Sequence, residues 1–146
     1  MQSKLDWVLL VDDDNDCNFF HQRVLTTVGC TNLIDVANDG WEALDVLKAK
    51  ALATSPGNGI IFLDINMPGL NGWEFLDEYI KPAMKLEQQI VIIMLSSSLN
   101  PDDKERALSY KCVNGFTNKP LTKVAVNALL AEHFPQKFNE PLVAAY

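Results

Sequence analysis

The sequence predicts an α/β domain built on a doubly wound, five-stranded parallel sheet with helices on both faces. Five short apolar segments alternate along the chain with five segments in which apolar residues recur at helical spacing. Such alternation favours parallel strands joined by right-handed crossovers. The length of 146 residues suits one domain. We therefore expect a single unit over residues 1–146, with its core at about residues 5–134 and a C-terminal tail at 135–146.

Composition and charge narrow the class of protein. The net charge is −7 and the 12 Lys and Arg residues form no cluster, which argues against direct binding of nucleic acid or of an anionic membrane. No apolar run approaches the ~20 residues that span a bilayer, and the N-terminus lacks the pattern of a signal peptide. Three widely spaced cysteines, Cys17, Cys30 and Cys112, fit structural thiols in a reducing compartment. We therefore expect a cytoplasmic protein.

The first two strand–helix units occupy the first third of the chain. Apolar residues 7–11 predict a buried strand that runs into the acidic segment 12–16. The helix that follows should stop at Gly29. A second strand is expected at residues 33–37 and a second helix at residues 41–47. The apolar face of the first helix is expected to comprise Phe19, Phe20, Val24, Leu25 and Val28.

The third unit follows a loop. Thr, Ser, Pro, Gly and Asn crowd residues 53–59, which predicts an irregular connection. Four apolar residues, Ile60–Leu63, then run directly into Asp64, as expected for a short strand buried on both faces. The next helix, over residues 73–79, should end before Pro82 because the residue before a proline disfavours helical geometry.

The last two units complete the pattern. Residues 90–95 form the strongest strand signal in the chain, and Asn100 with Pro101 gives an N-cap and a first helical position. A short strand is expected at residues 113–117, and Thr122 should cap the final helix. The inward face of that helix is expected to comprise Val124, Ala125, Ala128, Leu129 and Leu130.

Polar side chains follow four of the five predicted strands. At this size the sheet usually takes a flavodoxin-like arrangement, in which the carboxyl ends of the strands meet at one edge and form the ligand-binding edge. A carboxylate at the end of a buried strand is costly unless it is paired, so Asp64 is the expected reactive group. The residues that should converge there are Asp12, Asp13, Asp64, Ser96 and Lys119.

This combination of groups suits phosphoryl chemistry. Three neighbouring carboxylates raise one another's pKa values, and a divalent cation would relieve that repulsion. Mg²⁺ prefers oxygen ligands and keeps waters whose places phosphate oxygens can take. A carboxylate such as Asp64 can attack phosphorus to give an acyl phosphate. Lys119 would neutralise charge on the phosphoryl oxygens, and the Ser96 hydroxyl would donate a hydrogen bond to one of them.

Five motifs occur in order along the chain: Val-Asp-Asp-Asp at 11–14, Leu-Asp-Ile-Asn-Met-Pro-Gly at 63–69, Gly72, Ser96 and Gly-Phe-Thr-Asn-Lys-Pro at 115–120. In this order and at this spacing they resemble the receiver domain of two-component response regulators. The resemblance covers roughly residues 5–134, and no output domain follows in the sequence. The chain is therefore similar to the stand-alone, chemotaxis-regulator-like receivers, which act by binding another protein.

The resemblance implies a role in phosphorelay signalling. Asp64 would accept a phosphoryl group from a phosphohistidine of a histidine kinase or a histidine phosphotransfer protein. Mg²⁺ would be held by Asp13, by Asp64 and by the backbone carbonyl of Asn66, with Asp12 acting through water. Family members of this kind assist only their own phosphorylation and dephosphorylation, so the resemblance implies a regulator rather than an enzyme.

The resemblance also implies a switch. Ser96 would swing towards the phosphoryl group and Phe116 would follow into the vacated space. The surface of the fourth helix, fifth strand and fifth helix would then change its affinity for an output protein, which the sequence does not identify. In this family the peptide bond between Lys119 and Pro120 is typically cis, which would aim the lysine into the site.

Two other functions remain open from the sequence. A haloacid-dehalogenase-type phosphatase also uses a strand-end Asp with a second Asp two residues on, as at Asp12 and Asp14, but it needs a downstream acidic pair that this chain lacks. A degenerate receiver would serve as a constitutive interaction domain. We expect Asp14 to cap the first helix, and we expect His21 and His133 to have packing or solvated roles away from the site.

Overall fold

The computed structural model describes residues 4–52, 57–81, 89–98 and 100–138. Within these ranges the chain forms one parallel sheet with the strand order β2-β1-β3-β4-β5, the doubly wound, flavodoxin-like arrangement that the sequence predicts. The elements are β1 (Trp7–Val11), α1 (Asn15–Val28), β2 (Ile34–Ala37), α2 (Gly40–Ala51), β3 (Asn58–Asp64), α3 (Gly72–Tyr79), β4 (Gln89–Ser96), α4 (Pro101–Ser109), β5 (Val113–Asn118) and α5 (Lys123–His133).

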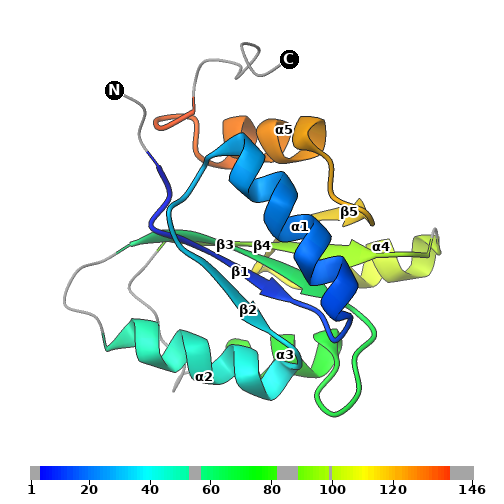
Figure 1. The fold of residues 1–146 in the computed structure, drawn as a ribbon. Coiled ribbons are helices and arrows are strands. Elements are labelled where there is room, and N and C mark those ends of the chain that lie inside the picture. Colours follow the sequence, from blue (N-terminus) through cyan, green and yellow to red (C-terminus); the bar gives the residue numbers. More distant parts are fainter. Residues whose placement is uncertain (1–3, 53–56, 82–88, 99, 139–146) are drawn as a thin grey trace.

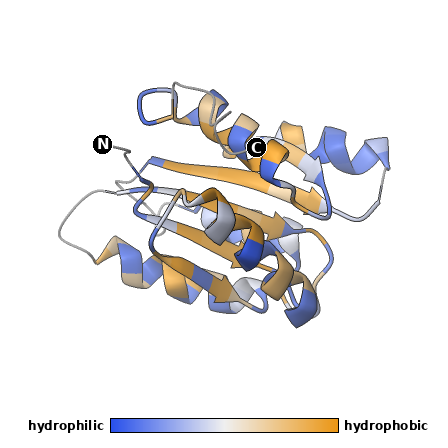
Figure 2. Cartoon of the chain, turned by 45° about the horizontal axis from the view of Figure 1, so that its top comes forward, coloured by the Kyte–Doolittle hydropathy of each residue, from blue (hydrophilic) through white to orange (hydrophobic). Residues whose placement is uncertain are grey.

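The sheet divides the core into two layers (Figure 1). Helices α1 and α5 cover one face of the sheet, and residues of α2, α3 and α4 pack on the other. Alternate residues of the central strand β3 serve the two layers: Ile60 and Phe62 face α1 and α5, whereas Ile61 and Leu63 face the opposite helices. Each such side chain contributes about 1.5–3 kcal/mol by its burial. The strands are accordingly apolar along most of their length, as Figure 2 shows.

Side-chain caps start the helices where the sequence predicts them. Asp14 accepts hydrogen bonds from the backbone N–H groups of Asp16 and Cys17, which confirms its expected capping role. Asn100 and Thr122 cap α4 and α5 in the same way. At the other end of α1, Gly29 takes a left-handed conformation with φ 74°, which a glycine adopts without steric cost.

Two predicted helix faces are partly wrong, although Leu25 and Leu130 are buried as expected. Phe19 is 62% exposed and Phe20 is also exposed, whereas the buried residues of α1 include the polar Asn18 and His21. In α5 the exposed fraction of Val124 is 80%, and the buried positions are Val126 and Leu130. In both helices the apolar residues are spread so widely around the helix axis that either of two rotations of the helix would bury some of them. The contacts of α1 with β1, and of α1 with α5, select one rotation.

The loop and tail boundaries also shift. Strand β3 begins at Asn58, so the last two residues of the predicted 53–59 loop belong to the sheet, while residues 53–56 lie outside the described ranges. The predicted tail begins with a turn that buries Phe138 among residues of the α1/α5 layer. Residues 139–146 lie outside the described part of the chain.

The three cysteines form no disulfide bond with one another. Cys17, Cys30 and Cys112 are all free thiols. Burial raises the pKa of Cys30 to about 11, so this thiol is protonated and unreactive at neutral pH. In the ranges that the structure describes, no helix combines the length and the apolar character needed to cross a bilayer.

Candidate functional site

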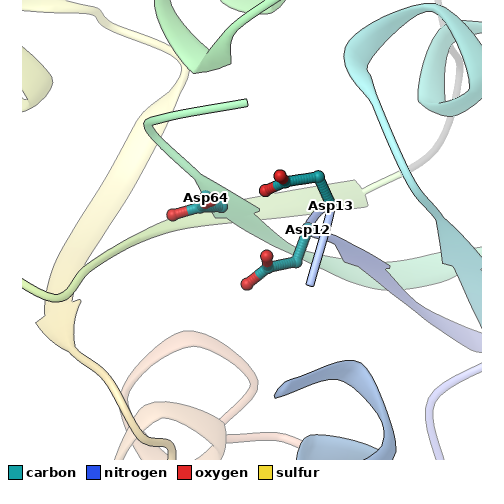
Figure 3. A group of neighbouring side chains, drawn as sticks. All are labelled: Asp12, Asp13 and Asp64. Atoms are coloured by element: carbon teal, nitrogen blue, oxygen red, sulfur yellow. The ribbon is translucent and has the colours of Figure 1, made fainter. Parts of the chain in front are cut away.

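Three carboxylates meet where β1 and β3 end. The two strands are paired in parallel with Val11 opposite Leu63, so the residues that follow them emerge side by side. Carboxylate oxygens of Asp12, Asp13 and Asp64 all lie within 4.8 Å of one another, and Figure 3 shows these side chains extending into the same space. Asp12 and Asp64 are buried, whereas Asp13 is exposed. The cluster therefore opens to solvent on the side of Asp13.

Lys119 supplies a cation to this cluster. Its Nζ lies 2.6 Å from Oδ2 of Asp12 and 3.1 Å from Oδ1 of Asp64. The backbone N–H of Lys119 donates to the carbonyl of Ser96 at 2.9 Å, which fixes the end of β5 against β4. The peptide bond between Lys119 and Pro120 is cis, as the resemblance implied. The lysine thus bridges the two buried carboxylates.

Burial and mutual repulsion change the acidity of these groups. The pKa of Asp64 is raised to about 6: burial is the largest cause, the charges of Asp12 and Asp13 also raise it, and Lys119 opposes the increase. Burial alone would lower the pKa of Lys119, but its hydrogen bonds with Asp12 and Asp64 outweigh that effect and raise it. At neutral pH the lysine is charged and Asp64 is mostly ionised, the states that a nucleophile and its neutralising partner require.

The other predicted site residues lie at the same edge of the sheet. Ser96 follows Leu95, the residue paired with Asp64, and its hydroxyl donates to the carbonyl of Ser98 at 3.1 Å and accepts from the Ser98 N–H at 3.0 Å. Phe116 on β5 is half-buried and packs against the core layer of α2, α3 and α4. Asn66, two residues after the end of β3, is exposed. Among the described residues, the Ser96 hydroxyl makes no hydrogen bond to the Asp64 carboxylate.

A close backbone approach fixes the connection that follows Asp64. The N–H of Gly72 donates to the carbonyl of Ile65 at 2.9 Å. A Cβ at position 72 would come within 2.6 Å of the Asp64 carbonyl oxygen, so the first turn of α3 can approach the end of β3 only with glycine there. This contact explains why a glycine at this spacing accompanies the strand-end carboxylate in the sequence.

Two further residues attach α1 to the site, and the sequence reasoning missed both. Asn18 Nδ2 donates to the carbonyl of Asp12 at 2.8 Å. His21 Nε2 accepts a hydrogen bond from the backbone N–H of Leu121 at 3.1 Å, two residues after Lys119. The packing role expected for His21 is confirmed, but the side chain adjoins the segment that carries Lys119. Asn18 and His21 are three residues apart, so the sequence places them on one helix face, and this could have indicated the contact. The apolar pattern that includes Phe19 and Phe20 favoured a different face.

The donor set suits a hard divalent cation. Three carboxylates offer oxygen atoms close enough to share one ion, and carboxylate oxygens are the ligands that Mg²⁺ prefers. Lys119 neutralises one charge of the three, which leaves a net negative site. Asp12, Asp13 and Asp64 therefore fit a magnesium ion, and other sites with three such ligands are not found in the part of the chain that the structure describes.

Fold and site together define a signalling module of the receiver type. The sheet topology, the acidic triad after β1 and β3, and the lysine after β5 occur in that combination in the receiver domains of signalling proteins. The chain belongs to the response regulator receiver domain family, whose model matches residues 8–131.

Three comparisons illustrate the similarity. A two-component response regulator from Cytophaga hutchinsonii is 34% identical, with a TM-score of 0.78 over 94% of this chain and 99% of that one. The probable methanogenesis regulatory protein FilR2 of Methanothrix harundinacea is 32% identical over 79% of this chain and 72% of its own length. The transcription factor SKN7 of Chaetomium thermophilum is 29% identical over 94% of this chain, which spans only 17% of that protein.

Proposed function

We propose that the chain is a phosphoaccepting receiver in which Asp64 takes a phosphoryl group from a phosphohistidine on a histidine kinase or a histidine phosphotransfer protein. The observation that carries this proposal is the placement of Asp64, buried beside Asp12 and Asp13 and paired with Lys119 at 3.1 Å. Each of these groups has a defined task in phosphoryl transfer, whereas a purely structural role would leave the buried carboxylates repelling one another.

In the proposed reaction an Oδ atom of Asp64 attacks the phosphorus and the P–N bond of the phosphohistidine breaks. The bonding electron pair stays on the imidazole nitrogen, and Asp64 becomes an acyl phosphate. The Lys119 ammonium, which pairs with the Asp64 carboxylate before the reaction, then pairs with a phosphoryl oxygen. Mg²⁺, held by Asp13 and Asp64 with the backbone carbonyl of Asn66 and with Asp12 through water, would neutralise the phosphoryl oxygens when bound.

The proposed readout passes through Ser96 and Phe116. To donate to a phosphoryl oxygen, the Ser96 hydroxyl must give up the hydrogen bond that it donates to the Ser98 carbonyl, which costs about 1 kcal/mol to lose. The phosphoryl contact would compensate for that loss, and Phe116 would then move inward from its half-buried position. The surface of α4, β5 and α5, which exposes Leu108 and Val124, would bind the output protein.

Labelling with a small phosphodonor tests the proposal. The wild-type chain, given acetyl phosphate and Mg²⁺, should form a phosphoprotein that is stable in acid and labile in base, and chelation with EDTA should prevent it. Asp64→Ala should abolish labelling, whereas Asp45→Ala, which removes an exposed acid from α2, should not change it. Undiminished labelling of Asp64→Ala would refute the assignment.

The same samples separate the alternatives. Turnover of p-nitrophenyl phosphate would indicate a phosphatase, and a receiver should show essentially none. A degenerate receiver would bind neither Mg²⁺ nor phosphoryl groups, so a titration with Mg²⁺ followed by tryptophan fluorescence would give no response. The assembled carboxylate triad and its lysine favour the active form.

A further inference from the structure

His21 is a buried polar residue that the phosphoryl-transfer chemistry does not use. Its side chain is 1% exposed, on the face of α1 that turns towards the sheet and α5. Nε2 of the ring accepts a hydrogen bond from the backbone N–H of Leu121 at 3.1 Å, and Leu121 itself is fully buried. A buried N–H without an acceptor costs about 1–3 kcal/mol, so this bond decides where residue 121 can lie.

The bond to His21 is one of two that hold the segment carrying Lys119. Of residues 119–121, Pro120 has no N–H to donate. The N–H of Lys119 donates to the Ser96 carbonyl on β4, and the N–H of Leu121 donates to His21 on α1. The start of the β5–α5 connection is therefore held from both sides, and the lysine side chain leaves it between those two anchors.

Helix α1 is in turn fixed to the other half of the site. Asn18, one turn before His21, donates from Nδ2 to the carbonyl of Asp12 at 2.8 Å, and the Asp12 carboxylate accepts from the N–H of Asp14 at 2.9 Å. One face of α1 thus contacts the backbone of Asp12 and the segment of Lys119. This helix face therefore holds the two backbone segments that carry the ion pair, in which the Asp12 carboxylate lies 2.6 Å from the Lys119 ammonium.

The protonation state of His21 suits an acceptor. Burial lowers the pKa of the ring; Asp12 opposes this change, and the charge of Lys119 adds to it. A neutral ring that accepts at Nε2 carries its proton on Nδ1, which lies 3.7 Å from the Cys17 sulfur.

We propose that His21 is a positioning residue that holds the Leu121 N–H and thereby places the Lys119 ammonium between Asp12 and Asp64. The inference rests on the proposed phosphoryl transfer for its effect on rate, but the placement of Lys119 can be measured without that reaction. A side chain at position 21 that cannot accept a hydrogen bond releases the segment, because the buried N–H of Leu121 must then move to reach water.

The test compares three variants in two backgrounds. His21→Leu and the more adaptable His21→Met remove the acceptor, and His21→Gln places an amide oxygen near the former Nε2. Each is made in the wild-type chain and in Lys119→Ala. The readouts are the initial rate of labelling by acetyl phosphate, the Mg²⁺ dissociation constant from tryptophan fluorescence, and hydrogen exchange of the Leu121 amide.

The expected results have opposite signs for rate and metal affinity. Removal of the acceptor should slow labelling about tenfold and speed Leu121 exchange by a similar factor, and Gln should recover most of both. Mg²⁺ should bind about threefold more tightly, because a displaced Lys119 competes less for Asp12 and Asp64. In Lys119→Ala the same substitutions should change neither rate nor metal affinity, since a residue acting through Lys119 cannot act without it.

Each adverse outcome has a distinct meaning. A wild-type chain that is not labelled refutes the proposed function, and the Mg²⁺ measurements in the two backgrounds still test the placement of Lys119. The positioning role is overturned if the Leu and Met variants lose rate equally in Lys119→Ala, or if they weaken Mg²⁺ binding along with the rate. It is also overturned if His21→Gln restores protection of the Leu121 amide but not the rate.

Discussion

Replacing Asp64 with asparagine should stabilise the metal-free domain, although it removes the proposed phosphoacceptor. In the folded chain the pKa of Asp64 is raised from its ordinary value of 3.8 to about 6, chiefly by burial. The difference, at 1.36 kcal/mol per pH unit, corresponds to a cost of about 3 kcal/mol when the carboxylate is ionised. Asparagine keeps the shape without the charge, so the free energy of unfolding should rise by about that amount.

The raised pKa of Asp64 determines how the free energy of unfolding depends on pH. The folded state holds a proton on Asp64 more tightly than the unfolded state, so the cost is fully present above about pH 6 and is absent below about pH 4. The advantage of Asp64→Asn should therefore be largest near neutral pH and disappear on acidification. Urea unfolding in EDTA, followed by tryptophan fluorescence, measures it at both ends of the range.

Asp45→Asn is the matched control. It removes the same charge from an exposed position on α2, and its free energy of unfolding should stay within about 0.5 kcal/mol of wild type. An Asp64→Asn variant no more stable than wild type in EDTA at neutral pH would refute the reasoning, because the raised pKa of Asp64 already includes the opposing effect of Lys119. A gain that persisted near pH 4 would show that its cause is not the charge.

Three further perturbations have defined outcomes. Saturating Mg²⁺ at about 100 times its dissociation constant should stabilise the wild-type chain by about 2.7 kcal/mol, measured by urea unfolding and reversed by EDTA, and should stabilise Asp64→Asn less. Gly72→Ala should cost about 1–3 kcal/mol of stability and weaken Mg²⁺ binding, because its Cβ would displace the Asp64 carbonyl; equal stability would contradict that contact. Tyr110→Phe should cost about 0.5–1 kcal/mol, since it removes the 2.9 Å hydrogen bond to Asp77 that ties the end of α4 to α3.

The sheet and the carboxylates could be predicted because both depend on short-range patterns. A short apolar run such as Ile60–Leu63, bounded by turn residues, is typical of a strand buried on both faces, and its direction fixes the edge at which Asp64 emerges. The parallel arrangement then brings Asp13 and Lys119 to the same edge without any knowledge of the strand order. The strand order itself depends on packing between distant segments, and the sequence left it open.

The predictions failed where two arrangements bury similar apolar area. In α5 the run Val124–Val126 offers an apolar residue to either rotational phase, and packing against α1 selects Val126. In α1 the predicted buried face included Phe19, which is exposed, and left out His21, which is buried. The burial of His21 depends on a partner 100 residues further along the chain. A polar residue satisfied by so distant a group cannot be recognised from local periodicity.

The late position of Lys119 and Leu121 in the chain also determines when the site becomes complete during synthesis. Asp12 and Asp64 leave the ribosome well before Lys119, the cation that bridges them, and before Leu121, the donor that docks on α1. A growing chain that lacks β5 therefore carries repelling acids at an unfinished sheet, and His21 lacks the N–H of Leu121 as its donor. Under the proposed function, reactivity towards phosphoryl donors would arrive only with the last strand, so a truncated product of synthesis would be a poor competitor for the same phosphohistidine.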